Sequence, residues 1–349
     1  MHAAWLGFDI VHQKKGKGVM KEDRLQFTVW LRAFGVLLIL ACHFTQQSGN
    51  IYLIMSSQFF NIGNSVFFIL SGFLFGIKSK SAFQNILPWY KKRLLRIYLP
   101  YELMLVVLFI ADLLVMKKVN LGRWLSQILG VQAWNVVYGA TQTWFVTSIL
   151  LCYLVTPVIA KVCSEVHGNN RATMQLAVIF AVVPAFLPFV SGGIFSDTTI
   201  ITPVLLCYAL AFLIGANFEK VVLTKRNAGV AFLLLCVGFG IRLAGRAVFD
   251  GTILYNQVIA TYTHAFGAFC IFYIFAVLFE DFKAIKVVSG FAAISYEVYL
   301  WHYMFTDGPL RLFGVSGVWI LDCVLVFGVS LIMACGAYWI TNRILLRLK

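Results

Sequence analysis

Residues 27–46 read FTVWLRAFGVLLILACHFTQ, and this segment decides the fold class. It is almost entirely apolar and contains one side chain that is always charged, that of Arg32. An α-helix of about 20 residues crosses a hydrocarbon core of about 30 Å. The segment is therefore predicted to be a transmembrane helix.

Comparable stretches recur along the whole chain of 349 residues, which is 61% hydrophobic and only 12% charged. Soluble globular chains carry about twice that charged fraction, so water would not solvate such a surface. The loops are short, the longest near residues 117–141, and no water-soluble domain fits between the segments. We predict an all-α, polytopic integral membrane protein with about ten transmembrane helices, near residues 27–46, 58–77, 95–116, 142–163, 172–190, 201–217, 227–244, 260–280, 287–305 and 315–341.

The positions of the Lys and Arg residues predict which loops face the cytoplasm. The net charge is +14, but these residues lie mainly in alternate loops, which indicates a topology signal rather than a nucleic-acid-binding surface. Placing both termini in the cytoplasm puts most of them on the cytoplasmic side, as the positive-inside rule requires. The opposite side then receives Lys117, Lys118, Arg123, Arg242, Arg246 and Arg311.

The N-terminal residues lack the features of a signal peptide, so we expect the first helix to remain in the mature protein. Met20 offers an alternative start, and whether residues 1–19 belong to the working sequence is left open. The predicted division is a cytoplasmic tail of residues 1–23, a transmembrane domain of residues 24–346 and a tail of residues 347–349. All eight cysteines lie in or at the ends of apolar segments without a C-x-x-C pair, so we expect neither disulfides nor a metal.

Ionisable residues inside apolar segments are the first candidates for function, because a charge in hydrocarbon is costly. Arg32 and His43 lie eleven residues apart, which is about three helical turns and about 16 Å of rise. They are predicted to share one helix face, with Arg32 nearer the cytoplasm and His43 nearer the outer end. Alternatively, Arg32 extends its charge to the lipid headgroups and His43 is an interfacial residue.

A basic cluster, KKRLLR at residues 91–96, opens the third segment on the cytoplasmic side. Arg93 and Arg96 are neighbours on one helix face, and paired guanidinium groups match phosphate oxygens. The same pattern is typical of a topology determinant that contacts lipid headgroups. Both interpretations stay open for the two arginines, whereas Lys91 and Lys92 fit the topology signal better.

The ninth segment carries a third cluster, ISYEVYLWH at residues 294–302. Glu297 is predicted about 15 Å deep and His302 about 22 Å deep, nearly at the depth of His43. A carboxylate near the bilayer midplane needs a partner or a proton. His302, with its aromatic neighbours, also fits an interfacial aromatic belt.

These segments, in this order, resemble the membrane acyltransferase-3 family, in which ten helices form the acyl-transfer domain. The resemblance spans about residues 24–346 and rests on five motifs, each weak by itself. They are Arg32-x10-His43, SVFFILSGFL at residues 65–74, RLLRIYLP at residues 93–100, Trp144-Phe145 with Tyr153 and Pro157, and ISYEVYLWH at residues 294–302.

The resemblance implies an acyltransferase in a bacterial plasma (cytoplasmic) membrane. Relatives move an acyl group, most often acetyl, from cytosolic acyl-CoA to hydroxyl groups of glycans. By that resemblance His43 is the catalytic histidine and Arg32 its partner in the motif, while Arg93 and Arg96 help to hold acyl-CoA. Whether His43 acts as a general base or carries the acyl group as a nucleophile stays open, as does the choice between acetyl and succinyl.

Four further residues complete the expected site. Trp144 is a candidate to stack on a sugar face, although it also fits a membrane-interface anchor, and Tyr299 is a second candidate acceptor contact. Glu297 and His302 are additional candidates for the catalytic groups. The expected partners are membrane lipids and a glycan acceptor, free or lipid-linked, and no nucleic acid.

The chain departs from the family pattern at several positions. The acidic residue three positions before the motif arginine is Val29, and the glycine after it is Ala33. The proline usually found after the Trp301-His302 pair is replaced within residues 303–305. None of these changes removes a proposed catalytic group, but each weakens the transfer of donor geometry and acceptor identity from relatives.

Two other functions compete with this one. A secondary transporter or glycan flippase would also contain ten helices with buried charges, but it predicts broken helices at corresponding positions of two halves. Pro184 and Pro188 have no obvious counterpart in the second half. The string His302-x4-Asp307 resembles the motif of glycerolipid acyltransferases, but here it would end a transmembrane helix on the outer side, away from cytosolic donors.

Overall fold

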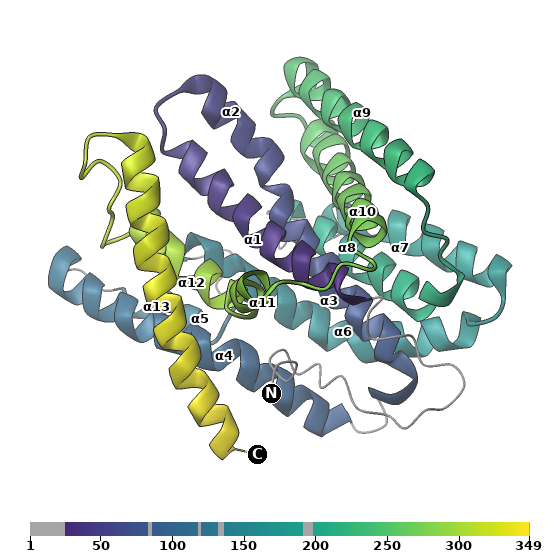
Figure 1. The fold of residues 1–349 in the computed structure, drawn as a ribbon, viewed down its shortest axis with the longest axis horizontal. Helices are drawn as coiled ribbons and strands as arrows, with labels where there is room; N and C mark the ends of the chain where they lie inside the picture. The colour runs from purple at the N-terminus through teal and green to yellow at the C-terminus, as the bar shows by residue number, and fades with distance from the viewer. Residues whose placement is uncertain (1–24, 83–85, 118–119, 132–135, 191–197, 349) are drawn as a thin grey trace. The chain divides into compact units, whose positions relative to one another are not determined.

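The computed structural model describes residues 25–82, 86–117, 120–131, 136–190 and 198–348. Within these ranges the chain forms helices and connecting loops and no β-strand (Figure 1). The predicted all-α class is therefore confirmed. The predicted cytoplasmic tail of residues 1–23 and the last residue of the C-terminal tail lie outside the described ranges.

Among the described residues, seven helical stretches are long and apolar enough to cross a membrane. Each coincides with a predicted segment. They are Phe27–Gln46, Ile51–Lys78, Ile86–Val115, Thr141–Val166, Lys225–Phe249, Leu254–Leu278 and Trp319–Arg347.

The three other predicted segments are also helical, as α7 (Asn170–Val190), α8 (Thr198–Ala216) and the pair α11 (Lys286–Ala293) and α12 (Ser295–Asp307). The last pair differs from the single helix predicted near residues 287–305. Ile294 has φ −97° and ψ 8°, and this non-helical backbone separates α11 from α12. The total of ten spans and the cytoplasmic location of the termini stay predictions.

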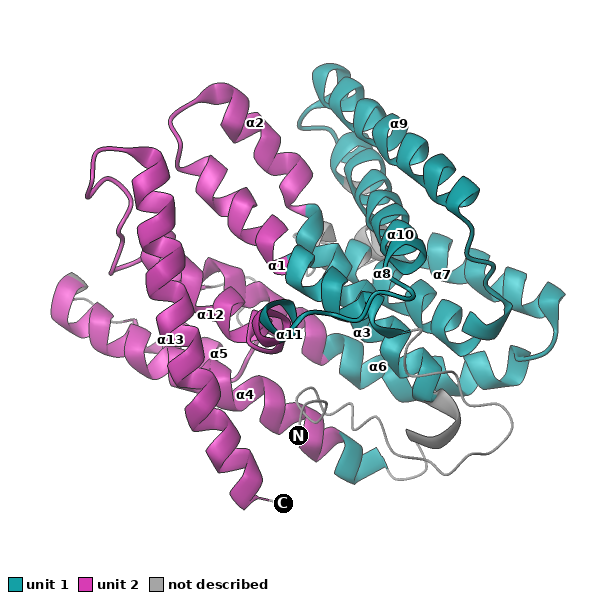
Figure 2. Ribbon diagram, in the orientation of Figure 1, with its two compact units in different colours: residues 1–35, 62–89, 151–289 teal, residues 36–61, 90–150, 290–349 magenta. Residues whose placement is uncertain are grey.

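The chain divides into two compact units (Figure 2). Unit 1 comprises residues 1–35, 62–89 and 151–289, and unit 2 comprises residues 36–61, 90–150 and 290–349. Helices α1 (Phe27–Gln46), α6 (Trp144–Val166) and α11 contribute residues to both units, as does the start of α4 (Ile86–Ala111). Unit 1 otherwise holds α3 (Ile62–Ala82), α7, α8, α9 (Lys225–Phe249), the π-helical turn η6 (Leu254–Ile259) and α10 (Ala260–Leu278).

Helices α3 and α8 of unit 1 approach each other closely because glycines line their crossing. A Cβ atom at Gly72 would lie 2.1 Å from the carbonyl oxygen of Tyr208, and one at Gly215 would lie 2.2 Å from that of Phe73. Small residues allow two membrane helices to bring their backbones together in this way. The glycine of the motif at residues 65–74 therefore serves helix packing.

An aromatic cluster fills the interior of unit 1 beside this crossing. The rings of Phe27, Phe73, Phe218 and Phe272 lie with neighbouring centroids 4.8 to 6.3 Å apart. All four side chains are buried, and tilted or edge-on contacts of this kind are the favoured geometry for aromatic pairs. The cluster itself contains no ionisable side chain.

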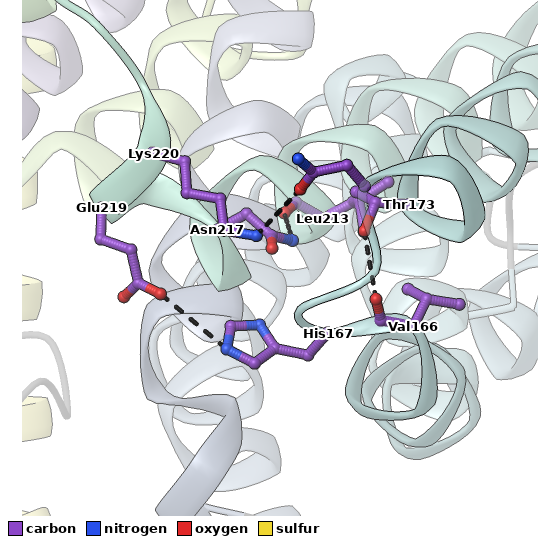
Figure 3. Close-up of polar contacts among 8 residues, drawn as sticks. Val166, His167, Thr173, Leu213, Asn217, Glu219 and Lys220 are labelled. Carbon is purple, nitrogen blue, oxygen red and sulfur yellow. Dashed lines mark hydrogen bonds and ion pairs between the residues drawn. The ribbon is translucent and has the colours of Figure 1, made fainter.

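Two loops of unit 1 that were predicted to lie on the same side of the membrane do lie together. The loop between α6 and α7 carries His167, whose Nε2 atom is 3.8 Å from Oε1 of Glu219 in the turn η5 (Phe218–Lys220) after α8 (Figure 3). Lys220 also donates to the side chain of Asn170, at 3.2 Å. The loop after α6 and the turn after α8 therefore lie next to each other. Which side of the membrane they face stays a prediction.

Unit 2 is built around α12. This helix packs along α13 (Trp319–Arg347) and against the short 3₁₀ turn η4 (Thr141–Thr143). The unit also holds α2 (Ile51–Phe60), most of α4, the π-helical turn η3 (Asp112–Met116) and α5 (Leu121–Ile128). Helix α5 lies in the longest predicted loop and shows that this connection has secondary structure of its own.

The end of α12 lies against the backbone that leads into η4. Gly139 has φ +78°, and a Cβ atom there would lie 2.6 Å from Cδ of Pro309 and 3.0 Å from Cα of Gly308. Both the left-handed backbone and the close approach require glycine at position 139. The contact holds the C-terminal end of α12 in place.

Candidate active site

Two histidines that are remote in the sequence face each other in unit 2. His43, near the C-terminal end of α1, and His302, in α12, have ring centroids 5.1 Å apart with their planes at 36°. The ring of Tyr303 stands edge-on to both, at 5.0 Å from His43 and 6.0 Å from His302. We call these three residues the histidine cluster.

The protonation pattern of neutral His302 follows from its hydrogen bond. Its Nδ1 atom lies 2.7 Å from the carbonyl oxygen of Tyr299. A carbonyl oxygen only accepts, so Nδ1 carries the ring hydrogen and Nε2 retains a lone pair. The side chain is fully buried, and its Nε2 has no hydrogen-bond partner among the described residues. His302 therefore offers a buried basic nitrogen.

A side-chain amide orients His43. Nδ1 of His43 lies 3.3 Å from Oε1 of Gln46, and Nε2 of Gln46 donates to Sγ of Cys42 at 3.6 Å. The second contact turns the amide oxygen toward the imidazole, so Nδ1 of His43 is the donor. The neutral ring then has its lone pair on Nε2, as in His302. His43 is half-buried, and it is thus the more accessible of the two rings.

Hydrogen bonds between η4 and α12 hold the histidine cluster in position. Nε2 of Gln142 donates to the carbonyl oxygen of Leu300 at 2.7 Å, and the hydroxyl of Tyr299 donates to the carbonyl oxygen of Gln142. The ring of Phe145 packs on that of Tyr299 with centroids 5.1 Å apart. Tyr299 was predicted to contact the acceptor substrate. In the structure its hydroxyl group is instead hydrogen-bonded to the backbone of Gln142.

Trp144 stands at the first position of α6, next to this clamp. Its side chain is half-buried, and its ring lies edge-on to that of Phe145 with centroids 6.4 Å apart. Phe145 in turn contacts Tyr299. Trp144 is therefore joined to the histidine cluster through two intervening aromatic rings.

A second polar cluster in unit 2 joins α4, α12 and α13. The hydroxyl of Tyr338 in α13 interacts electrostatically with both Glu297 and Arg96. Glu297 is buried at the N-terminal end of α12, and Arg96 is half-buried in α4. Arg93, one turn earlier in α4, is buried. We call Arg93, Arg96, Glu297 and Tyr338 the arginine cluster.

Helix α13 extends from one cluster toward the other. At its start, Nε1 of Trp319 donates to the carbonyl oxygen of Phe44, the residue after His43, at 2.9 Å. Tyr338 of the arginine cluster comes nineteen residues later in the same helix, which is about 28 Å of helical rise. That length is close to the thickness of a hydrocarbon core.

Arg32 lies in the part of α1 that belongs to unit 1. The helix is continuous from Phe27 to Gln46, as predicted, and the Arg32 side chain is buried. Burial does not fit an arginine that extends into the lipid headgroups.

Four residues in or beside these clusters were not found from the sequence: Gln46, Gln142, Tyr303 and Tyr338. Gln46 carried a usable signal, because residues three apart in a helix are neighbours. Gln142 is a polar residue just before Trp144-Phe145, a weaker signal. Nothing in the spacing of Tyr338 relates it to Glu297, since only the packing of α12 on α13 brings them together.

A scan against protein-family models finds an acyltransferase domain, that of the acyltransferase-3 model, over residues 28–342. The chain belongs to the acyltransferase-3 family. No curated protein and no solved structure matched. The protein is accordingly an acyltransferase, and its apolar helices make it a multi-pass membrane acyltransferase.

The motifs of this acyltransferase-3 chain serve two different purposes. The glycine of the segment at residues 65–74 allows α3 to pack on α8. The motif histidine of α1 and the segment at residues 294–302 instead meet in the histidine cluster. The histidine cluster, where these two motifs meet, is therefore the candidate site of the reaction.

Proposed function

We propose that this acyltransferase is an O-acyltransferase that moves an acyl group from cytosolic acyl-CoA to a hydroxyl group of a glycan. The observation that carries the proposal is the histidine cluster, with its half-buried His43 next to the buried His302. A hydroxyl group becomes a good nucleophile only when a base removes its proton. An imidazole changes its protonation state near neutral pH, and His43 offers a lone pair for that purpose.

The proposed donor is acetyl-CoA, bound at the arginine cluster. The guanidinium groups of Arg93 and Arg96 would contact the phosphates of the coenzyme, since planar guanidinium forks match phosphate oxygens. The flexible arm of the coenzyme would then follow α12 and α13 toward His43. The extent of α13 between Trp319 and Tyr338 supports a donor that enters far from the acceptor.

The other predicted residues receive supporting roles. Arg32 keeps its positive charge at any working pH, so it would act electrostatically rather than exchange protons. Glu297 would hold the N-terminal end of α12 near the coenzyme, through Tyr338. Trp144 would stack on a face of the sugar.

The proposed acceptor is a glycan that is built at, or exported through, a bacterial plasma membrane, either free or lipid-linked. The two clusters suggest this because a donor from the cytosol and an acceptor at the other side need separate entrances. Membrane lipids would be the other contacts of the protein.

The test is the formation of a covalent product. The full chain is reconstituted in lipid nanodiscs with acetyl-CoA radiolabelled in the acetyl group and a total extract of envelope glycans. We expect release of free CoA thiol and alkali-labile label in the glycan. Succinyl-CoA in a parallel reaction compares the two acyl groups. Transport of a glycan without release of CoA thiol would overturn the proposal in favour of a transporter.

A further inference from the structure

We propose that His43 and His302 work as one proton-accepting pair, in which the Nε2 atoms of both rings face the acceptor hydroxyl. This inference rests on the proposed O-acyl transfer and assigns His302 a share in the chemistry. Its basis is the position of the two rings, with centroids 5.1 Å apart, and the hydrogen bond that each ring makes through Nδ1.

The Nδ1 bonds determine what the pair can do. Gln46 and the carbonyl oxygen of Tyr299 each accept a hydrogen from one ring, so both neutral rings keep a lone pair on Nε2. Both rings lie in the described part of the chain, and no hydrogen bond joins them in the structure. With centroids 5.1 Å apart, a rotation that turns the ring edges toward each other would bring them close enough to share a single hydrogen. One proton can therefore be held by either ring and stabilised by the lone pair of the other.

The environment of His302 argues against a purely structural role. Nearly all buried polar atoms in proteins have a hydrogen-bond partner, but Nε2 of His302 is buried without one among the residues that the structure describes. The clamp between Gln142 and Leu300 holds α12, and with it this nitrogen, in place. A buried acceptor without a partner is available to the N–H group that His43 gains when it takes the substrate proton.

The transfer step balances with this pair as the only base. The acceptor oxygen attacks the carbonyl carbon of the thioester, and its proton passes to Nε2 of His43. The new N–H group donates to Nε2 of His302. The carbon–sulfur bond then breaks, the sulfur leaves with the bonding electron pair, and the thiolate takes up the proton as free CoA thiol. The acyl ester forms and both rings return to the neutral state.

The experiment is a double-mutant cycle on the full chain in nanodiscs, with acetyl-CoA and the envelope-glycan extract as substrates. We compare His43→Gln, His302→Gln and the double variant by kcat, normalised to the amount of folded protein. Each single change should lower kcat about 100-fold or more with the KM for acetyl-CoA unchanged, and the double variant should lie within about threefold of the His43 variant. If the loss of kcat in the double variant equals the product of the two single losses, the histidines act independently and the proposal is wrong. A His302→Gln variant with normal kcat would also overturn it.

The pH dependence of kcat distinguishes a proton shared between His43 and His302 from a purely structural role of His302. In His302→Gln the acidic limb of the kcat profile should move to lower pH by about one unit, because His43 loses the acceptor that stabilises its charged form. The other titratable side chains beside the rings, Cys42, Tyr299 and Tyr303, ordinarily stay protonated over this range. An unmoved limb in a folded variant contradicts the proposal. His264→Gln, a histidine change in α10, is the matched control and should leave the profile unaltered.

Gln46 gives a second test that leaves the buried ring intact. Gln46→Glu keeps an acceptor for Nδ1 of His43 and should retain most of the activity, whereas Gln46→Lys offers only donors and should lose about tenfold or more. Equal activity of the two variants would overturn the tautomer on which the pair depends.

Failure of the proposed function and failure of the histidine pair give different results. If the unmodified protein releases no CoA thiol, the proposed function is wrong. If it releases CoA thiol and the His302→Gln variant releases it equally fast, only the pair is wrong.

Discussion

The histidine cluster of unit 2 and the α3–α8 crossing of unit 1 are both tightly packed, but they are built from opposite kinds of residue. At the crossing, glycines bring the backbones of α3 and α8 together, and buried phenylalanines pack beside it. Neither kind of contact needs a hydrogen bond. The histidine cluster contains buried polar groups, including Nε2 of His302, which has no partner within the described part of the chain. Hydrogen bonds from η4 hold the cluster.

The difference teaches how to read a motif in a membrane helix. The presence of residues that pack well in the interior of a membrane protein, such as glycine and phenylalanine, is explained by their contribution to stability. A buried polar atom without a partner costs stability, so its presence calls for a different explanation. On this basis, changes in the histidine cluster should lower turnover more than stability, and changes at the crossing should do the reverse.

The largest effect is expected for His43→Ala. Loss of a general base typically lowers a rate by about 10² to 10⁴, and the variant should reach the membrane in normal amounts because the side chain is only half-buried. The measurement is release of CoA thiol per folded molecule. His167→Ala, a change of a half-buried histidine in a loop of unit 1, should keep full activity. Normal turnover by a fully expressed His43→Ala protein would remove the distinction between the two regions.

The reverse effect is expected for Gly72→Leu. The new side chain would begin 2.1 Å from the carbonyl oxygen of Tyr208, and overpacking of this severity costs about 3 kcal/mol. Thermal unfolding in detergent should show the loss, while the surviving folded molecules keep their turnover. Gly229→Leu in α9, where a Cβ atom meets open space, is the control. A stable Gly72→Leu protein would contradict the assigned packing role.

A smaller effect is expected for the double change Arg93→Ala and Arg96→Ala. Loss of two charged hydrogen-bonding groups should raise the KM for acetyl-CoA about 10- to 100-fold and flatten its dependence on salt. Lys91→Ala, an exposed lysine change on the same helix, should change neither quantity. An unaltered KM in the double variant would return both arginines to topology signals.

The smallest effect is expected for Tyr299→Phe. The change removes one hydrogen bond between α12 and the carbonyl oxygen of Gln142, which is worth about 1 kcal/mol, so kcat should fall about fivefold. Tyr273→Phe in unit 1 removes a bond donated to the carbonyl oxygen of Val222 and one accepted from the amide of Thr224, and it should leave kcat alone. Equal effects of the two changes would mean that the clamp does not position the histidine cluster.

Hydropathy predicted most of the fold. Seven predicted segments coincide with helices that are long and apolar enough to span, because the thickness of the bilayer requires a long apolar stretch that is visible in the chain. The break at Ile294 was not predicted, since no proline or glycine marks it. The short helix α5 was missed for a related reason, because eight residues in a polar loop carry too little pattern.

The candidate site was predictable one helix at a time. The cost of burying ionisable groups identified Arg32, His43, Glu297 and His302 as candidates. The basic cluster at residues 91–96 identified Arg93 and Arg96. The sequence did not predict that His43 pairs with His302, or that Tyr338 connects Arg96 with Glu297. Spacing within one helix does not show which faces of two helices are in contact.

By itself, the sequence determined that the chain is a multi-helix membrane protein of the acyltransferase-3 family, because hydrophobic length and motif order are properties of the chain alone. Only the tertiary structure decided that the motif glycine at position 72 serves packing and that His302 faces His43. It also decided which nitrogen of each ring keeps its lone pair, because that depends on partners such as Gln46 and the Tyr299 carbonyl group. Chemistry at this site depends on distances between helices, and those distances exist only after the helices have packed.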